Sequence, residues 1–247
     1  MCWVRTARRT ACRSAKIGYV PDEPSLYDWM TVAETGWFTA GFYPDGYQSQ
    51  YNQLVEGYGL DPSKKLKELS KGMRAKVVLA LALAHQPDVL ILDEPTSGLD
   101  SLVRREFLES MVDMAGEGRT VFVSSHQIHE VERVADTVGI IREGRLLLVE
   151  PLDRLKSQVR ELIITRDESN GSPLQLPGSF LSRSVQGRQE RLMVRGWSDE
   201  QVQRLANHDE VSVMDTHSPN LEEIFVAYMR MGNEVDGPPV DAEVLTS

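Results

Sequence analysis

Two adjacent carboxylates, Asp93 and Glu94, follow a compact apolar segment at residues 88–92 that is typical of a β-strand. Ligands of α/β proteins bind in the crevice outside the carboxyl ends of the strands, so both side chains would face such a crevice. Asp93 could hold Mg²⁺ through its hydration water, and Glu94 could orient or deprotonate a water that attacks a phosphate. The alternative is an acidic turn that caps a helix after Pro95.

A second candidate site begins at Ser70, which precedes Asp93 by 93 − 70 = 23 residues. That interval accommodates one helix and a turn back into the strand. Ser70 is a favourable N-cap, and with Gly72 beside it the helix could present N–H groups and its dipole to a phosphate. A capped helix without a ligand is the alternative for this motif.

Two further polar motifs follow predicted strands. Ser97-Gly98-Leu99-Asp100 comes directly after the first strand, and Ser124-Ser125-His126 ends a second strand at residues 120–124. A histidine at a strand's carboxyl end could hydrogen-bond a phosphate oxygen or orient the attacking water. A single histidine there is more often structural, but several such motifs in one order favour phosphate chemistry.

The elements that must position these motifs alternate between strands and helices. Residues 17–20 are expected to form a short strand that ends at Pro21, and residues 102–115 a helix between the strands at 88–92 and 120–124. This alternation predicts a parallel sheet in an α/β fold.

The second half of the chain shows a different pattern. Residues 138–149 are expected to form a hairpin around Gly144, and a smaller unit starts near residue 161. Its strands and helices alternate and end in an amphipathic helix at residues 221–229. These features predict a small α+β unit after the parallel sheet.

An aromatic segment with helical character separates the first strand from Ser70. Its rings are Tyr27, Trp29, Trp37, Phe38, Phe42, Tyr43, Tyr47, Tyr51 and Tyr58. Most of them are expected to form the core of a small helical subdomain. The alternative is a docking surface for another protein, since exposed aromatic patches often mark interfaces.

Composition excludes several classes of protein. The 247 residues carry a net charge of −10, which gives sequence-independent nucleic-acid binding no electrostatic support. Two cysteines, Cys2 and Cys12, allow neither a disulfide framework nor a zinc site made of cysteines, and fit a reducing cytosol. No apolar run approaches the roughly 18 residues that cross a bilayer, so membrane work would need a separate spanning partner.

Taken in order, the motifs from about residue 17 to residue 151 resemble the nucleotide-binding domain of ATP-binding cassette (ABC) proteins. The resemblance implies an α/β, P-loop NTPase-like ATPase core, here incomplete, with a helical subdomain at about 25–86. It also implies Glu94 as the catalytic base, His126 as the switch histidine and Asp93 on the Mg²⁺ side.

The same resemblance implies that ATP is shared between two subunits. Ser70, Gly72 and Asp100 would contact the ATP held by the opposite subunit of a homo- or heterodimer. Asp22 stands where the family usually has glutamine, and it could still take Mg²⁺ or a bridging water.

Two departures and the C-terminal unit narrow the resemblance. Lys71 and Met73 replace the usual glycine and glutamine of the family's signature motif. Together with Asp22, the small C-terminal unit and its ending at residues 218–225, they are similar to a branch of exporter ATPases whose membrane-spanning subunits are separate proteins. The resemblance therefore implies a cytoplasmic subunit, peripheral on the inner face of the plasma membrane, that hydrolyses ATP to drive transport.

The 247 residues contain no match to the Walker A pattern G-x-x-x-x-G-K-[ST], whose backbone and lysine wrap the phosphates of ATP. We expect a truncated gene model with a non-native basic start at 1–16, an organelle-targeting peptide being the alternative there. The other expected parts are the ATPase domain at 17–151, an accessory domain at 152–231 and a disordered tail at 232–247. This chain alone would neither hold nor hydrolyse ATP; the alternative is a degenerate cassette that acts as an interaction module for a partner ATPase.

Overall fold

The computed structural model describes residues 16–166 and 176–231. The chain forms two compact units, of which the first ends at Val134 and the second begins at Ala135. The expected basic start, except for Lys16, and the expected tail lie outside the described residues. The domain limit that the sequence places after residue 151 stays a prediction.

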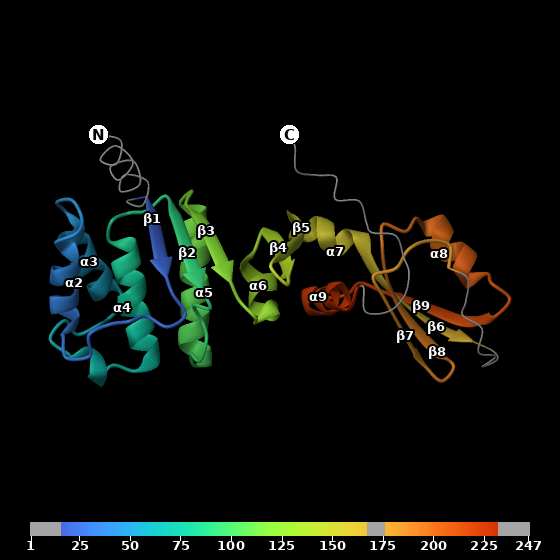
Figure 1. The fold of residues 1–247 in the computed structure, drawn as a ribbon, viewed down its shortest axis with the longest axis horizontal. Helices are drawn as coiled ribbons and strands as arrows, with labels where there is room; N and C mark the ends of the chain where they lie inside the picture. Colours follow the sequence, from blue (N-terminus) through green and yellow to red (C-terminus); the bar gives the residue numbers. More distant parts are fainter. Residues whose placement is uncertain (1–15, 167–175, 232–247) are drawn as a thin grey trace. The chain divides into compact units, whose positions relative to one another are not determined.

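A three-stranded parallel sheet in the order β1-β2-β3 forms the centre of the first unit (Figure 1). The strands span Ile17–Val20 for β1, Val89–Asp93 for β2 and Thr120–Ser124 for β3. In the register, Val20 lies beside Leu92, and Asp93 lies beside Ser124. The carboxyl ends of all three strands therefore lie at one edge of the sheet.

Two long helices cover one face of this sheet. Helix α4 spans Lys71–Leu83 and helix α5 spans Ser101–Gly116. Both pack on the buried side chains of Val20, Leu90 and Leu92. Burial of this apolar face is the main force that holds the sheet and the helices together.

The opposite face of the sheet is apolar as well. Ile17, Tyr19 and Phe122 lie on it and are 40%, 55% and 60% exposed. The register places Tyr19 beside Ile91, and Ile91 beside Phe122, so Tyr19, Ile91 and Phe122 form one row across the sheet. Parallel sheets are normally covered on both faces, which makes this row an exposed apolar surface of an unusual kind.

A helical subdomain is inserted between β1 and β2. It contains α2 at Val32–Ala40, α3 at Tyr47–Gly57, a 3₁₀ turn at Leu66–Glu68 and then α4. The Tyr47 and Tyr51 hydroxyls donate hydrogen bonds of 2.8 Å to the carbonyls of Leu81 and Val32. These two bonds satisfy the polar ends of buried rings, and burial raises the pKa of both tyrosines.

The aromatic segment divides into two groups. Tyr47 and Tyr51 are buried, and Tyr43 and Tyr58 are partly buried. The remaining five rings are exposed: Tyr27, Trp29, Trp37, Phe38 and Phe42. The expectation that most of the nine rings form the core is therefore wrong, because aromatic composition does not show which side of a short helix faces solvent.

Helix α6, at Ile128–Val134, follows β3 and ends the first unit. The second unit opens with an antiparallel hairpin of β4, Thr137–Arg142, and β5, Arg145–Pro151. Glu143 and Gly144 both have positive φ angles at its turn, as a two-residue hairpin connection requires.

A four-stranded antiparallel sheet in the order β7-β8-β6-β9 completes the second unit. Its elements are α7 at Leu152–Gln158, β6 at Val159–Arg166, β7 at Ser182–Gln186, β8 at Gln189–Arg195, α8 at Asp199–Ala206, β9 at Val211–His217 and α9 at Leu221–Arg230. Arg195 on β8 contacts Glu150, Gln158 and the Tyr228 hydroxyl, and so connects β5, α7 and α9. Within residues 16–166 and 176–231, no helix is both long and apolar enough to cross a membrane.

Candidate functional site at the carboxyl edge of the parallel sheet

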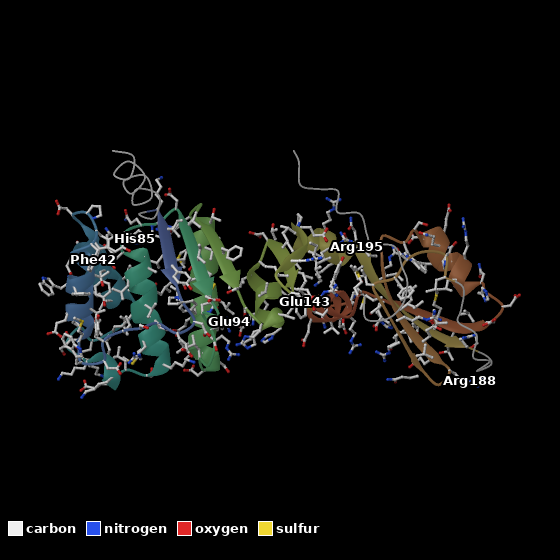
Figure 2. The ribbon with its side chains drawn as sticks, viewed as in Figure 1. Phe42, His85, Glu94, Glu143, Arg188 and Arg195 are labelled. Atoms are coloured by element: carbon white, nitrogen blue, oxygen red, sulfur yellow. The ribbon has the colours of Figure 1, made fainter. Side chains whose placement is uncertain are left out.

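The candidate site lies at the carboxyl edge of the parallel sheet. Figure 2 labels Glu94 there, at the end to which the strand arrows point. Asp93 is the last residue of β2, and the Ser124 hydroxyl donates a 2.5 Å hydrogen bond to its Oδ1. Adjacent parallel strands thus hold the Asp93 carboxylate at the edge.

Glu94 has a φ of +47°, a left-handed conformation that is costly for a residue with a side chain. Its N–H still donates to the Ser124 carbonyl at 2.9 Å, so the β2–β3 ladder continues through it. Strain of this kind persists where the surrounding structure enforces it, often at functional sites.

His126 binds both oxygens of the Glu94 carboxylate. The His126 N–H donates to Glu94 Oε1 at 2.8 Å, and His126 Nδ1 lies 2.7 Å from Oε2. The Glu94 side chain is 22% exposed and that of His126 69%, which leaves the rest of the imidazole open to a ligand.

The loop between Glu94 and α5 is fixed by a buried glutamate that the motifs do not reveal. Glu130, on α6, accepts a 2.6 Å hydrogen bond from the Thr96 hydroxyl and pairs with Arg104 Nε at 3.1 Å. Arg104 also donates to the Leu99 carbonyl at 3.0 Å. Glutamate in a short helix usually lies on the solvated face, so composition and spacing gave no signal for it.

The N-terminus of α4, which is expected to face a phosphate, lies next to the N-terminus of α5. Ser70 caps α4 by accepting from the Met73 N–H, and Asp100 caps α5 by accepting from two N–H groups of its first turn. A β-carbon on Gly72 would meet Val103 Cγ1 at 2.8 Å, so glycine at this position lets the start of α4 pack against α5. Positive helix ends and their free N–H groups favour an anion at this surface.

Lys71, the first residue of α4, lies over the loop that leads to Asp100. Its Nζ would contact a β-carbon built on Gly98, whose φ is +66°. The start of α4 therefore lies beside this loop, and Ser70, Gly72 and Asp100 belong to one neighbourhood.

The oxygen donors at the edge fit Mg²⁺ bound together with phosphate. Asp22 lies in an exposed bend just after β1, and Asp93 and the Ser124 hydroxyl lie at the end of β2 and β3. Mg²⁺ keeps several waters and takes one or two carboxylates plus phosphate oxygens, which such hard donors provide. In the described ranges, no group of three His, Cys, Asp or Glu side chains could hold a metal by itself.

Known proteins are similar to this chain. Residues 4–97 match the family model described as "ABC transporter". The ABC transporter ATP-binding protein YtrB of Bacillus subtilis is 28% identical over 218 residues, which cover 85% of this chain and 71% of YtrB. The bacitracin transport ATP-binding protein BcrA of Bacillus licheniformis is 35% identical over 151 residues, 60% of this chain and 49% of BcrA.

A solved structure described as the ATP-binding subunit of an ABC transporter matches with a TM-score of 0.55 and 28% identity, over 61% of this chain and 65% of that one. This likeness confirms the predicted α/β fold of an ABC ATPase. Several curated relatives are matched over about half of their length or less. The chain is therefore similar to the nucleotide-binding domain of ABC transporters.

Proposed function

We propose that this chain is the ATP-binding and ATP-hydrolysing subunit of an ABC transporter, and that it drives transport through separate membrane subunits. The observation that carries the proposal is the Glu94 carboxylate, held beside Asp93 at the carboxyl edge of the sheet by two contacts with His126. A carboxylate in that place can take a proton from a water that attacks a phosphate.

The proposed hydrolysis uses Glu94 as the base. The attacking water gives one proton to the Glu94 carboxylate, its oxygen bonds to the γ-phosphorus, and the bond from that phosphorus to the ADP oxygen breaks. His126 contacts each Glu94 oxygen once, and each oxygen has a further lone pair that can accept from the attacking water. The exposed His126 ring could then donate to a γ-phosphate oxygen, and Mg²⁺ at Asp93 and Asp22 would neutralise phosphate charge.

A second part of the proposal concerns a half-site. The 247 residues contain no Walker A motif, so this chain by itself would not hold or hydrolyse ATP. Ser70, Gly72 and Asp100 lie at adjacent helix starts and would contact ATP held by a second ABC ATPase subunit. A complete partner could therefore use this surface.

Titration calorimetry of the purified chain with Mg-ATP tests the first statement; a stoichiometric low-micromolar site would contradict it. The half-site is tested by mixing the chain with an intact ABC ATP-binding subunit and measuring turnover. We expect Ser70→Arg to lower the turnover of the mixture, with Ser184→Arg on exposed β7 as the control. Equal turnover with both variants would refute the half-site.

Glu94 is tested in any longer form of this protein that contains a Walker A motif. Glu94→Gln should abolish turnover there while ATP stays bound, because the amide cannot accept the proton. Retained hydrolysis would remove Glu94 as the base.

The competing function is a degenerate cassette that binds a partner ATPase without turnover. Its support is the absence of the Walker A pattern from the 247 residues. Translation of the DNA upstream in three frames separates the two functions, because only the catalytic one requires that motif in the gene.

The aromatic surface supports a protein partner. We define it as Tyr27, Trp29, Trp37, Phe38 and Phe42. Tyr27 lies within ring contact of Trp29 and Phe38, with centroids 5.9 and 6.2 Å apart, and Phe38 lies 5.6 Å from Phe42. Residues 17–60 hold six acidic residues and no lysine or arginine, but Arg74 pairs with Asp28 and Lys65 lies beside Thr31, so the support comes from the exposed rings rather than from charge.

Membrane-spanning transporter subunits are the partners that we propose for this surface. Their docking would place the chain at the inner face of the plasma membrane. We propose export as the direction of transport, on the resemblance of the signature motif and the C-terminal unit to exporter ATPases.

A further inference from the structure

Glu130 is a charged residue in an almost completely buried place. Its relative exposure is 3%, and it lies on α6, four residues after His126. A buried carboxylate is costly unless its oxygens are paired. The Thr96 hydroxyl donates to Oε2 at 2.6 Å, and Arg104 Nε lies 3.1 Å from Oε1 as an ion-pair contact without hydrogen-bond geometry.

These contacts fix the loop at residues 95–100 from two sides. Thr96 is itself 1% exposed and ties the start of the loop to α6. Arg104, on α5, ties its end through the 3.0 Å bond to the Leu99 carbonyl. Gly98 lies between the two points in a left-handed conformation, so the loop would gain freedom if either tie were lost.

The same short segment of chain holds Glu94. His126 contacts the Glu94 carboxylate through its N–H and its ring, and α6 begins two residues later. His126 thus contacts Glu94 directly. Glu130 contacts Thr96, which lies two residues after Glu94 in the chain. Its left-handed φ of +47° requires neighbours that enforce it.

We propose that Glu130 is a positioning residue, whose carboxylate holds Thr96 and Arg104 so that Glu94 stays in register with His126. The role of Glu94 as the base rests on the proposed function. The positioning itself does not, since it concerns contacts within the chain.

The test uses the full 247-residue chain, uniformly labelled with ¹⁵N, and follows the His126 amide by NMR. An N–H that donates to a carboxylate has a displaced proton shift and slow exchange with solvent. We expect Thr96→Val, which removes only the hydroxyl tie, to move this signal and to speed its exchange roughly tenfold or more, the scale of a hydrogen bond to a charged group. Thr96→Ser should restore the wild-type signal.

Glu130→Gln should act in the same direction as Thr96→Val, because it removes the charge that Arg104 faces. The matched control is Glu190→Gln in the second unit. Glu190 is 1% exposed and pairs with Arg183 Nε at 2.6 Å, so the same substitution removes a similar buried charge far from this loop in sequence. The control should leave the His126 signal unchanged.

Amide signals of α2 and α3 report in every variant whether the first unit is folded. If Thr96→Val and Glu130→Gln lower the unfolding temperature but leave the His126 amide shift and exchange unchanged, Glu130 is merely structural and the proposal is overturned. Failure of Glu94 as the base would appear in the turnover assay instead, so the two failures are distinguishable.

Discussion

Gly72→Ala separates packing from ligand binding at the start of α4. A β-carbon there would lie 2.8 Å from Val103 Cγ1 and 3.1 Å from Cγ2, so one of the two helices must shift. Overpacking of this kind costs about 1–3 kcal/mol. Alanine in place of glycine in a helix contributes up to about 1 kcal/mol in the other direction. The net expected loss in the free energy of unfolding is therefore about 0–3 kcal/mol.

The destabilisation by Gly72→Ala should shrink when Val103 is shortened. Val103→Ala removes both methyl groups that the new β-carbon would meet. In that background only the β-carbon of residue 103, 3.3 Å from the new methyl group, remains close, so most of the packing cost of Gly72→Ala should disappear and the helix-propensity gain of up to about 1 kcal/mol should offset the rest.

Urea unfolding of the four proteins, followed by the emission of Trp29 and Trp37 on the first unit, measures the coupling. Because substitutions in contact do not add, the double-mutant cycle isolates the clash. If Gly72→Ala had the same effect with valine and with alanine at position 103, glycine would not be needed there for packing, and the reasoning would be refuted.

Three further predictions concern the same unit. Acrylamide, a neutral quencher, should quench the emission of Trp29 and Trp37 efficiently, because both rings are exposed. The difference from a Trp29→Phe/Trp37→Phe variant isolates these two rings, and weak quenching would argue against an exposed aromatic surface. Burial lowers the pKa of His85 below its usual 6.5. The stability that neutral His85 contributes is therefore present above pH 6.5 and is lost as the pH falls through the folded-state pKa. Thermal unfolding between pH 7.5 and 5 should show this loss of stability, and His85→Phe should make the loss smaller. Asp100→Ala should lower the free energy of unfolding in urea by about 1 kcal/mol, because two N–H groups of α5 lose their cap. Asp100→Asn should lower it little, because asparagine also caps helices. Equal losses in the two variants would contradict the capping role of Asp100.

The sequence was sufficient for the features that local patterns encode. Apolar runs that end in Asp93 and in Ser124, with a helix of the right length between them, predict parallel strands because each pattern depends on residues next to one another in the chain. The structure confirms the α/β fold, and the order of motifs led to the ABC family that the matches with known proteins support. The roles of the individual site residues stay predictions.

Only the tertiary structure decided which distant groups meet. Thr96 and Glu130 are 34 residues apart, and no local pattern shows that a glutamate of a short helix turns inward to hold the loop after Glu94. The same limit applies to Gly72, which the sequence predicts as a ligand contact and which the structure also packs against Val103. It also explains why the sequence did not predict that five rings of the aromatic segment are exposed. Burial is a property of the assembled fold, because a side chain is removed from water by neighbours that the chain brings from elsewhere.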